Sequence, residues 1–233
     1  MKQWCLGYTG FMGGWVLLLL SGCPEAEVRC PQGMVMIPAG PARLGVDQPR
    51  VWQETSRTVS LHAYCIDTYE YPNVAGEPPQ AQVTWDDANA ACLSIGKRLC
   101  TAAEWERACR GPEGRMYAYG ETRDATACNT PIEGGSPGPV PPKTKSGGWS
   151  RCQTPEGVFD LNGSLSEWVS DPWDGEPEPF NRELTVNPDT WRTLRGGTMW
   201  SQTFYGQDCT SRHGHQTSFH NIDDGFRCCQ DAN

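Results

Sequence analysis

The stretch Gly96-Lys-Arg-Leu-Cys-Thr-Ala-Ala-Glu-Trp-Glu106 contains the clearest structural signal in the chain. Thr101 is a residue type favoured at a helix N-cap, and Glu104 follows it at the spacing of a capping box. This pattern predicts a helix over residues 101–109, which Gly111-Pro112 would end. Because both ends are marked, this helix gives a fixed point from which the neighbouring elements can be placed.

Weaker signals on either side of that helix predict a small α+β domain. Upstream, Thr84 is the N-cap of a second predicted helix over residues 86–95. Short strands are predicted over residues 34–38, which a turn signal closes, and over residues 59–66, where apolar and polar residues alternate. No long helix is predicted after these elements. Residues 130–148, rich in Pro, Gly, Ser and Thr, predict a surface loop.

The composition narrows the class of protein. The 233 residues include 12 Cys, 26 Gly, 19 Pro and 10 Trp, with a formal net charge of -9. An acidic chain without clustered Lys and Arg is not expected to bind nucleic acid or an anionic membrane surface. The many cysteines favour an oxidising compartment, because cytosolic thiols are kept reduced. The length is enough for one compact, disulfide-rich domain with its own core.

The N-terminus indicates export and lipid attachment. Lys2 and a short apolar run over residues 11–20 are typical of a signal peptide, because the run is too short to span a membrane comfortably. The sequence then reads Leu20-Ser-Gly-Cys23, which resembles the lipobox of bacterial lipoproteins. In that family the chain is cut before the cysteine, whose thiol carries a diacylglycerol anchor. The alternatives are an ordinary signal peptide, or a disordered start with an incidental cysteine.

The resemblance to lipoproteins sets the expected organisation of the chain. We expect a signal peptide over residues 1–22, a lipidated tether over residues 23–32 and a folded domain over residues 33–233. The residue after the lipidated cysteine is Pro24 and not an aspartate. By the resemblance to lipoproteins, this implies the outer membrane of a bacterial cell envelope. The protein would then reach the membrane through the lipid on Cys23.

Several short blocks occur in a characteristic order between residue 33 and the C-terminus. They are Gly33-Met-Val-Met-Ile-Pro-Ala-Gly40, Ala63-Tyr-Cys-Ile-Asp-Thr-Tyr-Glu-Tyr-Pro-Asn73, Val83-Thr-Trp-Asp-Asp-Ala88, the stretch over 96–106, Gly157-Val-Phe-Asp-Leu-Asn-Gly-Ser-Leu-Ser-Glu-Trp168, Leu194-Arg-Gly-Gly197 and Gly225-Phe-Arg-Cys228. This ordered set resembles the formylglycine-generating enzyme (sulfatase-modifying factor) family. The resemblance implies an irregular α+β fold related to C-type lectins, with little regular secondary structure. The activity it implies is the copper-dependent oxidation, by oxygen, of a cysteine in a sulfatase.

The resemblance also implies two disulfides, Cys92–Cys228 and Cys109–Cys209. The first joins a helix to the terminal Gly-Phe-Arg-Cys segment, and the second joins the end of the other helix to a later Cys-x-x-Arg segment. Proximity and exclusion alone then suggest three more pairs. A vicinal bridge between Cys228 and Cys229 competes with them, although its ring is strained. The three further pairs are Cys30–Cys65, Cys128–Cys152 and Cys100–Cys229.

The cysteines that the family uses for catalysis have no counterpart in this sequence. Members that oxidise sulfatases hold copper with two thiolates after a Gly-Gly turn, and copper(I) prefers thiolate ligands. Here residues 198–208, which follow Gly196-Gly197, contain no cysteine, and the first of the two positions falls on Ser201. Copper and the family's oxidation are therefore not expected. We predict a non-catalytic envelope protein that binds or scaffolds a protein or glycan partner. The alternative is an oxidase that acts on a sulfatase cysteine through an atypical site.

A calcium site is implied by the block that runs from Asp160 to Glu167. In the family, these two positions provide side-chain oxygens, while the positions of Gly163 and Leu165 provide backbone carbonyls. Calcium takes about six to eight oxygen ligands, which a loop with two carboxylates can help to supply. The alternative is an acidic turn held by hydrogen bonds without a metal. A second family site would begin at Asn129, but its downstream ligand positions are lacking here.

Two further groups of residues are candidates for chemistry or recognition. His213, His215 and His220 form a histidine cluster, and histidines two apart on a strand point to one side, where they can share zinc or iron. The alternative is a polar loop whose histidines contact water. Four tryptophans in polar stretches are candidates either for partner recognition or for partial burial under loops. They are Trp149, Trp173, Trp191 and Trp200.

Overall fold

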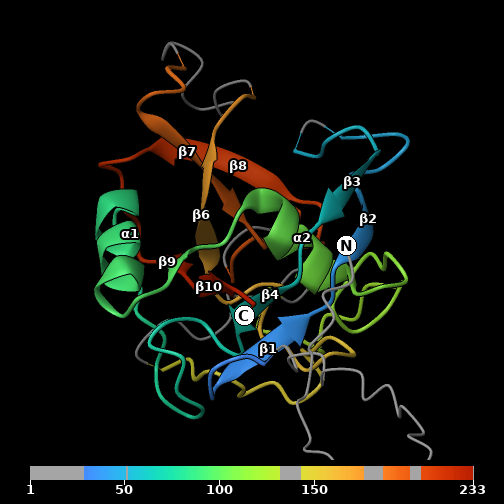
Figure 1. The fold of residues 1–233 in the computed structure, drawn as a ribbon, viewed down its shortest axis with the longest axis horizontal. Helices are drawn as coiled ribbons and strands as arrows, with labels where there is room; N and C mark the ends of the chain where they lie inside the picture. The colour runs from blue at the N-terminus through green and yellow to red at the C-terminus, as the bar shows by residue number, and fades with distance from the viewer. Residues whose placement is uncertain (1–28, 51, 132–142, 176–185, 200–205, 233) are drawn as a thin grey trace, which may run out of the picture.

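The computed structural model describes residues 29–50, 52–131, 143–175, 186–199 and 206–232 (Figure 1). Within these residues, short helices and strands alternate with long irregular connections, as expected for the predicted α+β class. In chain order the elements are β1 (Met34–Ile37), β2 (Gly40–Leu44), β3 (Arg57–Leu61), β4 (Tyr64–Asp67), α1 (Trp85–Ser94), β5 (Arg98–Leu99), α2 (Ala102–Arg110), β6 (Ser166–Pro172), β7 (Trp191–Arg195), β8 (Arg212–Gln216), β9 (Asp224–Phe226) and β10 (Cys228–Asp231).

Both helices begin with a capping box. At the start of α2, the Thr101 hydroxyl accepts from the backbone N–H of Glu104 at 3.2 Å, and the Glu104 carboxylate accepts from the Thr101 N–H at 2.8 Å. At the start of α1, Thr84 and Asp87 form the same reciprocal pair. Each box satisfies N–H groups that the first turn of a helix leaves unpaired. The two predicted helices are confirmed, each displaced by one residue from its predicted bounds.

The first sheet has the strand order β1-β4-β10-β5 and joins the two ends of the domain. β4 lies between β1 and β10 and is antiparallel to both, so that Ile66 faces Val35 on one side and Cys229 on the other. The prediction of one strand over residues 59–66 is wrong. The structure divides this run into β3, which pairs with β2, and β4, which enters the sheet. The alternation of apolar and polar residues continues across the division and therefore gave no sign of it.

The second sheet has the strand order β8-β7-β6-β9 and contains most of the residues discussed below. β6 pairs in parallel with β9, while β7 is antiparallel to both β6 and β8. These strands are short and bounded by irregular loops, so the sequence gave no clear period-two signal for them. In Figure 1, α1 lies at one edge of the molecule and α2 near its centre, in front of these strands. Across the described ranges, no helix has the length and apolar character needed to span a membrane.

Two buried tryptophans organise the core, one in each of two clusters. Trp105 of α2 packs among residues of the first sheet and the loop before β6, while Trp168 of β6 packs against α1 and β9. Each indole N–H has an acceptor: Trp105 donates to Glu167 and Trp168 donates to the carbonyl of Val83, at 2.7 and 2.9 Å. A buried indole with its N–H satisfied adds a large apolar surface without an unpaired polar group.

Five disulfides cross-link the domain, and they join the pairs named from the sequence. They are Cys30–Cys65, Cys92–Cys228, Cys100–Cys229, Cys109–Cys209 and Cys128–Cys152. No cysteine among the described residues is free. The adjacent Cys228 and Cys229 do not bond to each other, because neighbouring residues of a strand point to opposite faces. Their bridges accordingly lie in different core clusters.

Two tryptophans considered for recognition are core residues instead. Trp173 and Trp191 are only 5% and 2% exposed. Trp149 is half-buried, and Trp200 lies outside the described residues. Of this set, the structure therefore leaves only Trp149 partly available at the described surface.

Candidate functional site

A buried ion pair between Glu167 and Arg227 lies where the two sheets meet. The guanidinium donates from Nε and Nη2 to the two carboxylate oxygens of Glu167, both at 2.7 Å. Trp105 Nε1 donates to one of these oxygens, also at 2.7 Å. The same guanidinium donates to the backbone carbonyls of Asp67, Thr68 and Phe159. Glu167 and Arg227 thus satisfy each other inside the protein, where a lone charge would be very costly.

Two further carboxylates, Glu70 and Asp160, lie close enough to this pair to feel its charges. Glu70 is fully buried; Oε1 accepts from the Leu165 N–H at 3.2 Å, while Oε2 has no hydrogen-bond partner. Burial, with added repulsion from Asp160 and Glu167, raises the pKa of Glu70 well above its usual value. Burial also raises the pKa of Asp160 to about 6, although the Gly147 N–H and Arg227 act in the opposite direction. The carboxylates of Glu70, Asp160 and Glu167 thus surround the guanidinium of Arg227, and we call these three groups the carboxylate cluster.

The structure brings together the residues of the predicted calcium loop, and it adds one. Asp160 and Glu167 both belong to the carboxylate cluster, and Leu165 contacts it through its N–H. The sequence did not predict Glu70 as part of this cluster, because Glu70 lies 90 positions before Asp160 and no local pattern indicates that its carboxyl group is buried. Glu167 carries three hydrogen bonds from Arg227 and Trp105. Asp160 and Glu70 are therefore the carboxylates best able to contact a cation.

Gly163 and Asn129, the other predicted calcium residues, lie against each other. A Cβ atom on Gly163 would come within 2.3 Å of the Asn129 carbonyl oxygen, and the backbone has a φ of +74° there, so only glycine fits. The next N–H, that of Ser164, donates to the same carbonyl at 2.8 Å. The Asn129 side chain donates to Thr144 at 3.0 Å. These contacts fix the loop that leads into β6.

A second cluster of potential ligands combines His213 and His215 of β8 with Asp224 of β9. One ligand atom from each of the three lies within 4.8 Å of the others. The third histidine of the sequence-based cluster, His220, is exposed and is not part of this group. Asp224 was not among the candidate ligands from the sequence; it lies on β9, at the opposite edge of the second sheet from β8. Burial lowers the pKa of His213 well below its usual value and that of His215 to about 4.

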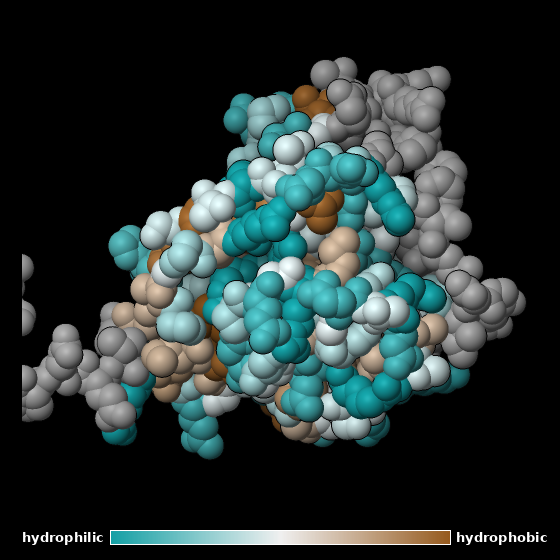
Figure 2. Space-filling view, turned by 90° about the vertical axis from the view of Figure 1, so that its right-hand side faces the viewer, coloured by the Kyte–Doolittle hydropathy of each residue, from teal (hydrophilic) through white to brown (hydrophobic). Residues whose placement is uncertain are grey.

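An open cleft of about 1450 Å³ lies among the loops that follow α2 and precede β6. It is lined by charged side chains and by the ring of Tyr119, which stacks on the ring of Tyr117 with centroids 5.2 Å apart. Arg151 and Asp124 form an ion pair at 2.7 Å in its wall. Figure 2 shows this side of the molecule, which is mostly hydrophilic. The cleft therefore suits a polar ligand or a protein surface better than an apolar molecule.

The fold is an irregular α+β arrangement of the C-type-lectin-like class. The model of the Sulfatase-modifying factor enzyme 1-like domain family matches residues 71–232, and the chain belongs to this family. Among solved structures, Treponema denticola variable protein 1 has a TM-score of 0.63 and 21% identity, and the match covers 85% of this chain and 94% of that one. This likeness shows the shared fold and confirms the predicted fold class.

Two curated relatives differ in activity. The chain is 25% identical over 299 residues to the formylglycine-generating enzyme of Bos taurus, covering 89% of this chain and 77% of the relative. It is 29% identical over 167 residues to the inactive C-alpha-formylglycine-generating enzyme 2 of Mus musculus, covering 67% of this chain and 50% of the relative. The family thus includes both enzymes and members described as inactive, so membership alone does not decide activity.

We predict that Asp160→Asn stabilises the metal-free domain at neutral pH. The pKa of Asp160 is raised to about 6 in the folded state, so the native protein holds this proton more tightly than the unfolded chain does. Its contribution to stability is complete below about pH 4 and is lost as pH rises through about 6. At pH 7 the charge therefore costs up to about 3 kcal/mol, which a neutral amide avoids. Asparagine also tolerates the local φ of +61°.

The measurement is urea unfolding of the parent and the variant at pH 4 and pH 7, with a chelator present. The gain should be present at pH 7 and absent at pH 4. The control is Asp47→Asn, because Asp47 is exposed and hydrogen bonds from Ser56 and Arg43 lower its pKa. This control should give no gain at either pH. A gain of the same size at both pH values for Asp160→Asn would contradict the assigned charge effect.

Proposed function

We propose that this chain is a non-catalytic member of its family and acts as a binding or scaffolding domain in the bacterial cell envelope. One observation carries the proposal: residues 198–208 contain no cysteine, so the segment after Gly196-Gly197 offers no thiolate to copper. Cys209, the next cysteine, is joined to Cys109 in a disulfide. Ser201, at the family's first catalytic position, lies outside the described residues. The similarity to an enzyme described as inactive supports the same conclusion.

The open cleft after α2 is the surface that we assign to the partner, a protein or a glycan. It combines arginine side chains, acidic groups and a tyrosine ring, the residue types that recognise polar ligands through hydrogen bonds and stacking. The loops around it are fixed on one side by the Cys128–Cys152 disulfide and on the other by the ion pair of Arg107 and Glu156. A cleft held in this way is pre-formed, which reduces the entropy lost when a partner binds.

The envelope location follows from the expected lipid on Cys23. Residues 1–28 lie outside the described residues, so this part of the proposal rests on the sequence. The five disulfides support it, because such a cross-linked domain suits an oxidising compartment. The lipid would hold the domain at the outer membrane, with the segment over residues 24–32 as the tether.

We also propose a structural calcium ion at the carboxylate cluster. The residues fit a hard cation because Glu70 has a buried oxygen without a partner and Asp160 is buried with a raised pKa. Calcium would supply positive charge to a cluster in which three carboxylates face one guanidinium. We assign Asp160 and Glu70 as its side-chain ligands, with backbone oxygens of the loop around Gly163 and Leu165 as further candidates.

The catalytic part of the proposal is tested with a sulfatase-type Cys-x-Pro-x-Arg peptide, copper and oxygen. We expect the peptide cysteine to stay unchanged, because the chain lacks the thiolate pair that would hold copper(I). Mass spectrometry of the peptide, with an aldehyde-reactive probe, measures the outcome. The bovine formylglycine-generating enzyme is the positive control. Conversion of the peptide by the present chain would contradict the proposal and favour the oxidase alternative.

The binding part is tested by replacing a side chain in the cleft. We expect Tyr119→Ala to weaken binding to arrayed envelope glycans or peptides by about tenfold, since stacking and burial of a tyrosine ring account for roughly this much. The matched control is Leu93→Ala, an exposed side chain on α1 that does not line the cleft. Equal binding by the parent and both variants would place the partner elsewhere on the surface.

Calcium is tested by thermal unfolding at pH 7 with and without the ion. We expect added calcium to raise the unfolding temperature of the parent, because a ligand that binds only the folded state stabilises it. Asp160→Asn should lose most of this gain while keeping its higher metal-free stability. Magnesium at the same concentration is the control for ionic strength. An equal rise with magnesium, or an unchanged calcium response in the variant, would contradict the assignment.

A further inference from the structure

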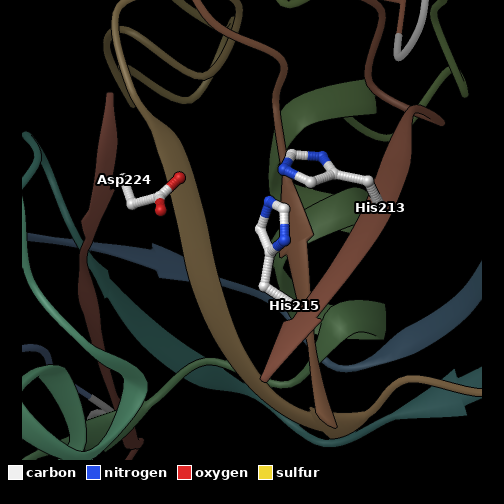
Figure 3. Close-up of side chains that lie close together, drawn as sticks. All are labelled: His213, His215 and Asp224. Carbon is white, nitrogen blue, oxygen red and sulfur yellow. The ribbon is translucent and has the colours of Figure 1, made fainter. Parts of the chain in front are cut away.

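We propose that His213, His215 and Asp224 form a binding site for a divalent transition-metal ion such as Zn²⁺. Their ligand atoms lie within 4.8 Å of one another. Figure 3 shows the two imidazoles side by side, with the Asp224 carboxylate directed towards them. This site and the carboxylate cluster have no residue in common, and only this site offers nitrogen as well as oxygen ligands.

The strand geometry explains why the two histidines act together. His213 and His215 are two positions apart on β8, so their side chains leave the same face of the strand. Gly214 between them faces the other way, where Trp173 lies against it: a Cβ atom at Gly214 would be 2.1 Å from the tryptophan ring. Trp173 thus packs directly on the backbone of β8. The histidine pair is carried on a strand that cannot shift easily.

The three side chains are already held near their binding positions. The His215 ring stacks on Phe219 with centroids 4.1 Å apart and is perpendicular to the His213 ring at 5.2 Å. Asp224 is fixed through its backbone, because its N–H donates to the Asn221 carbonyl at 3.1 Å. His213 and Asp224 are only 5% and 2% exposed. Little side-chain freedom would be lost when a metal binds, which favours affinity.

The ligand set selects the class of metal. Two neutral imidazoles and one carboxylate suit Zn²⁺ and similar ions, whereas calcium and magnesium prefer oxygen ligands alone. Ligand atoms that share a tetrahedral zinc ion lie roughly 3.3 Å apart, so atoms now up to 4.8 Å apart would approach by up to about 1.5 Å when the ion binds. Three protein ligands leave a fourth position for water or for an oxygen or nitrogen of a bound partner.

The burial of the two rings favours the form that binds metal. Burial lowers the pKa of both histidines, which favours the neutral imidazole, the form that binds metal. The environment also includes aromatic rings, since the Trp168 ring meets His215 edge-on at 6.4 Å. An apolar surrounding of this kind strengthens the attraction between a carboxylate and a cation.

The test is titration of the full chain, purified without a histidine tag, first with Co²⁺ and then with Zn²⁺. Cobalt bound by this ligand set gives visible absorption bands, which zinc should remove by displacement. We expect one ion per chain. His215→Ala and Asp224→Asn should each weaken zinc binding by at least about 100-fold, because each removes one of three ligands.

His220→Ala is the matched control, because it removes an exposed histidine from the same region. It should leave zinc affinity unchanged, as should Asp160→Asn in the separate carboxylate cluster. Thermal unfolding without metal shows whether each variant folds, and zinc should raise the unfolding temperature of the parent but not of His215→Ala. Zinc binding that His220→Ala abolishes, or that both ligand variants retain, would overturn the proposal. So would the absence of zinc binding by a folded parent chain, since the trio would then be only hydrogen-bonded.

Discussion

The ion pair between Glu167 and Arg227 is the constraint on which the rest of the domain depends. Arg227 lies between β9 and β10, and it is therefore the residue at which the chain passes from the second sheet to the first. Its guanidinium contacts Glu167 of β6 and the carbonyls at the end of β4, while Glu167 also accepts from Trp105 of α2. Neither charge could remain buried alone, so the two sheets and α2 must assemble together around this pair.

The residues directly after Arg227 extend this connection. Cys228 bonds to α1 through Cys92, and Cys229 bonds to Cys100 just before α2. The two bridges close almost the same large loop, since their partners are eight residues apart at one end and adjacent at the other. Once one bridge is present, the second closes a loop of only about ten residues, which the chain-loop model values at about 2.7 kcal/mol against about 5 kcal/mol for the large loop. The two bridges also lie in different core clusters, so each adds local packing to its own cluster.

The sequence predicts the elements that have local signals, but it does not predict those that depend on contacts between distant residues. The capping box of Thr101 and Glu104 marks α2 because both partners lie within one turn. The prediction of one strand over residues 59–66 was wrong, because β3 pairs with the preceding strand β2 while β4 pairs with the distant β10, and neither contact shows in the run itself. The loop from Asp160 to Glu167 was recognisable from its family pattern, but Glu70 and Asp224 were not, since only the folded sheets bring them to their clusters.

The buried groups that hold the fold together are separate from the segment in which the family places its copper ligands. This explains how one fold can be kept while its chemistry changes. The frame depends on buried groups such as Arg227 and the Gly163 turn, where substitution leaves a charge unpaired or forces a clash. The segment over residues 198–208, after Gly196-Gly197, has no thiolate in this chain and so lacks the ligand type that copper(I) prefers. The metal sites proposed for this chain lie elsewhere in the fold: imidazole and carboxylate groups of β8 and β9 would hold a transition-metal ion, and the carboxylate cluster would hold calcium.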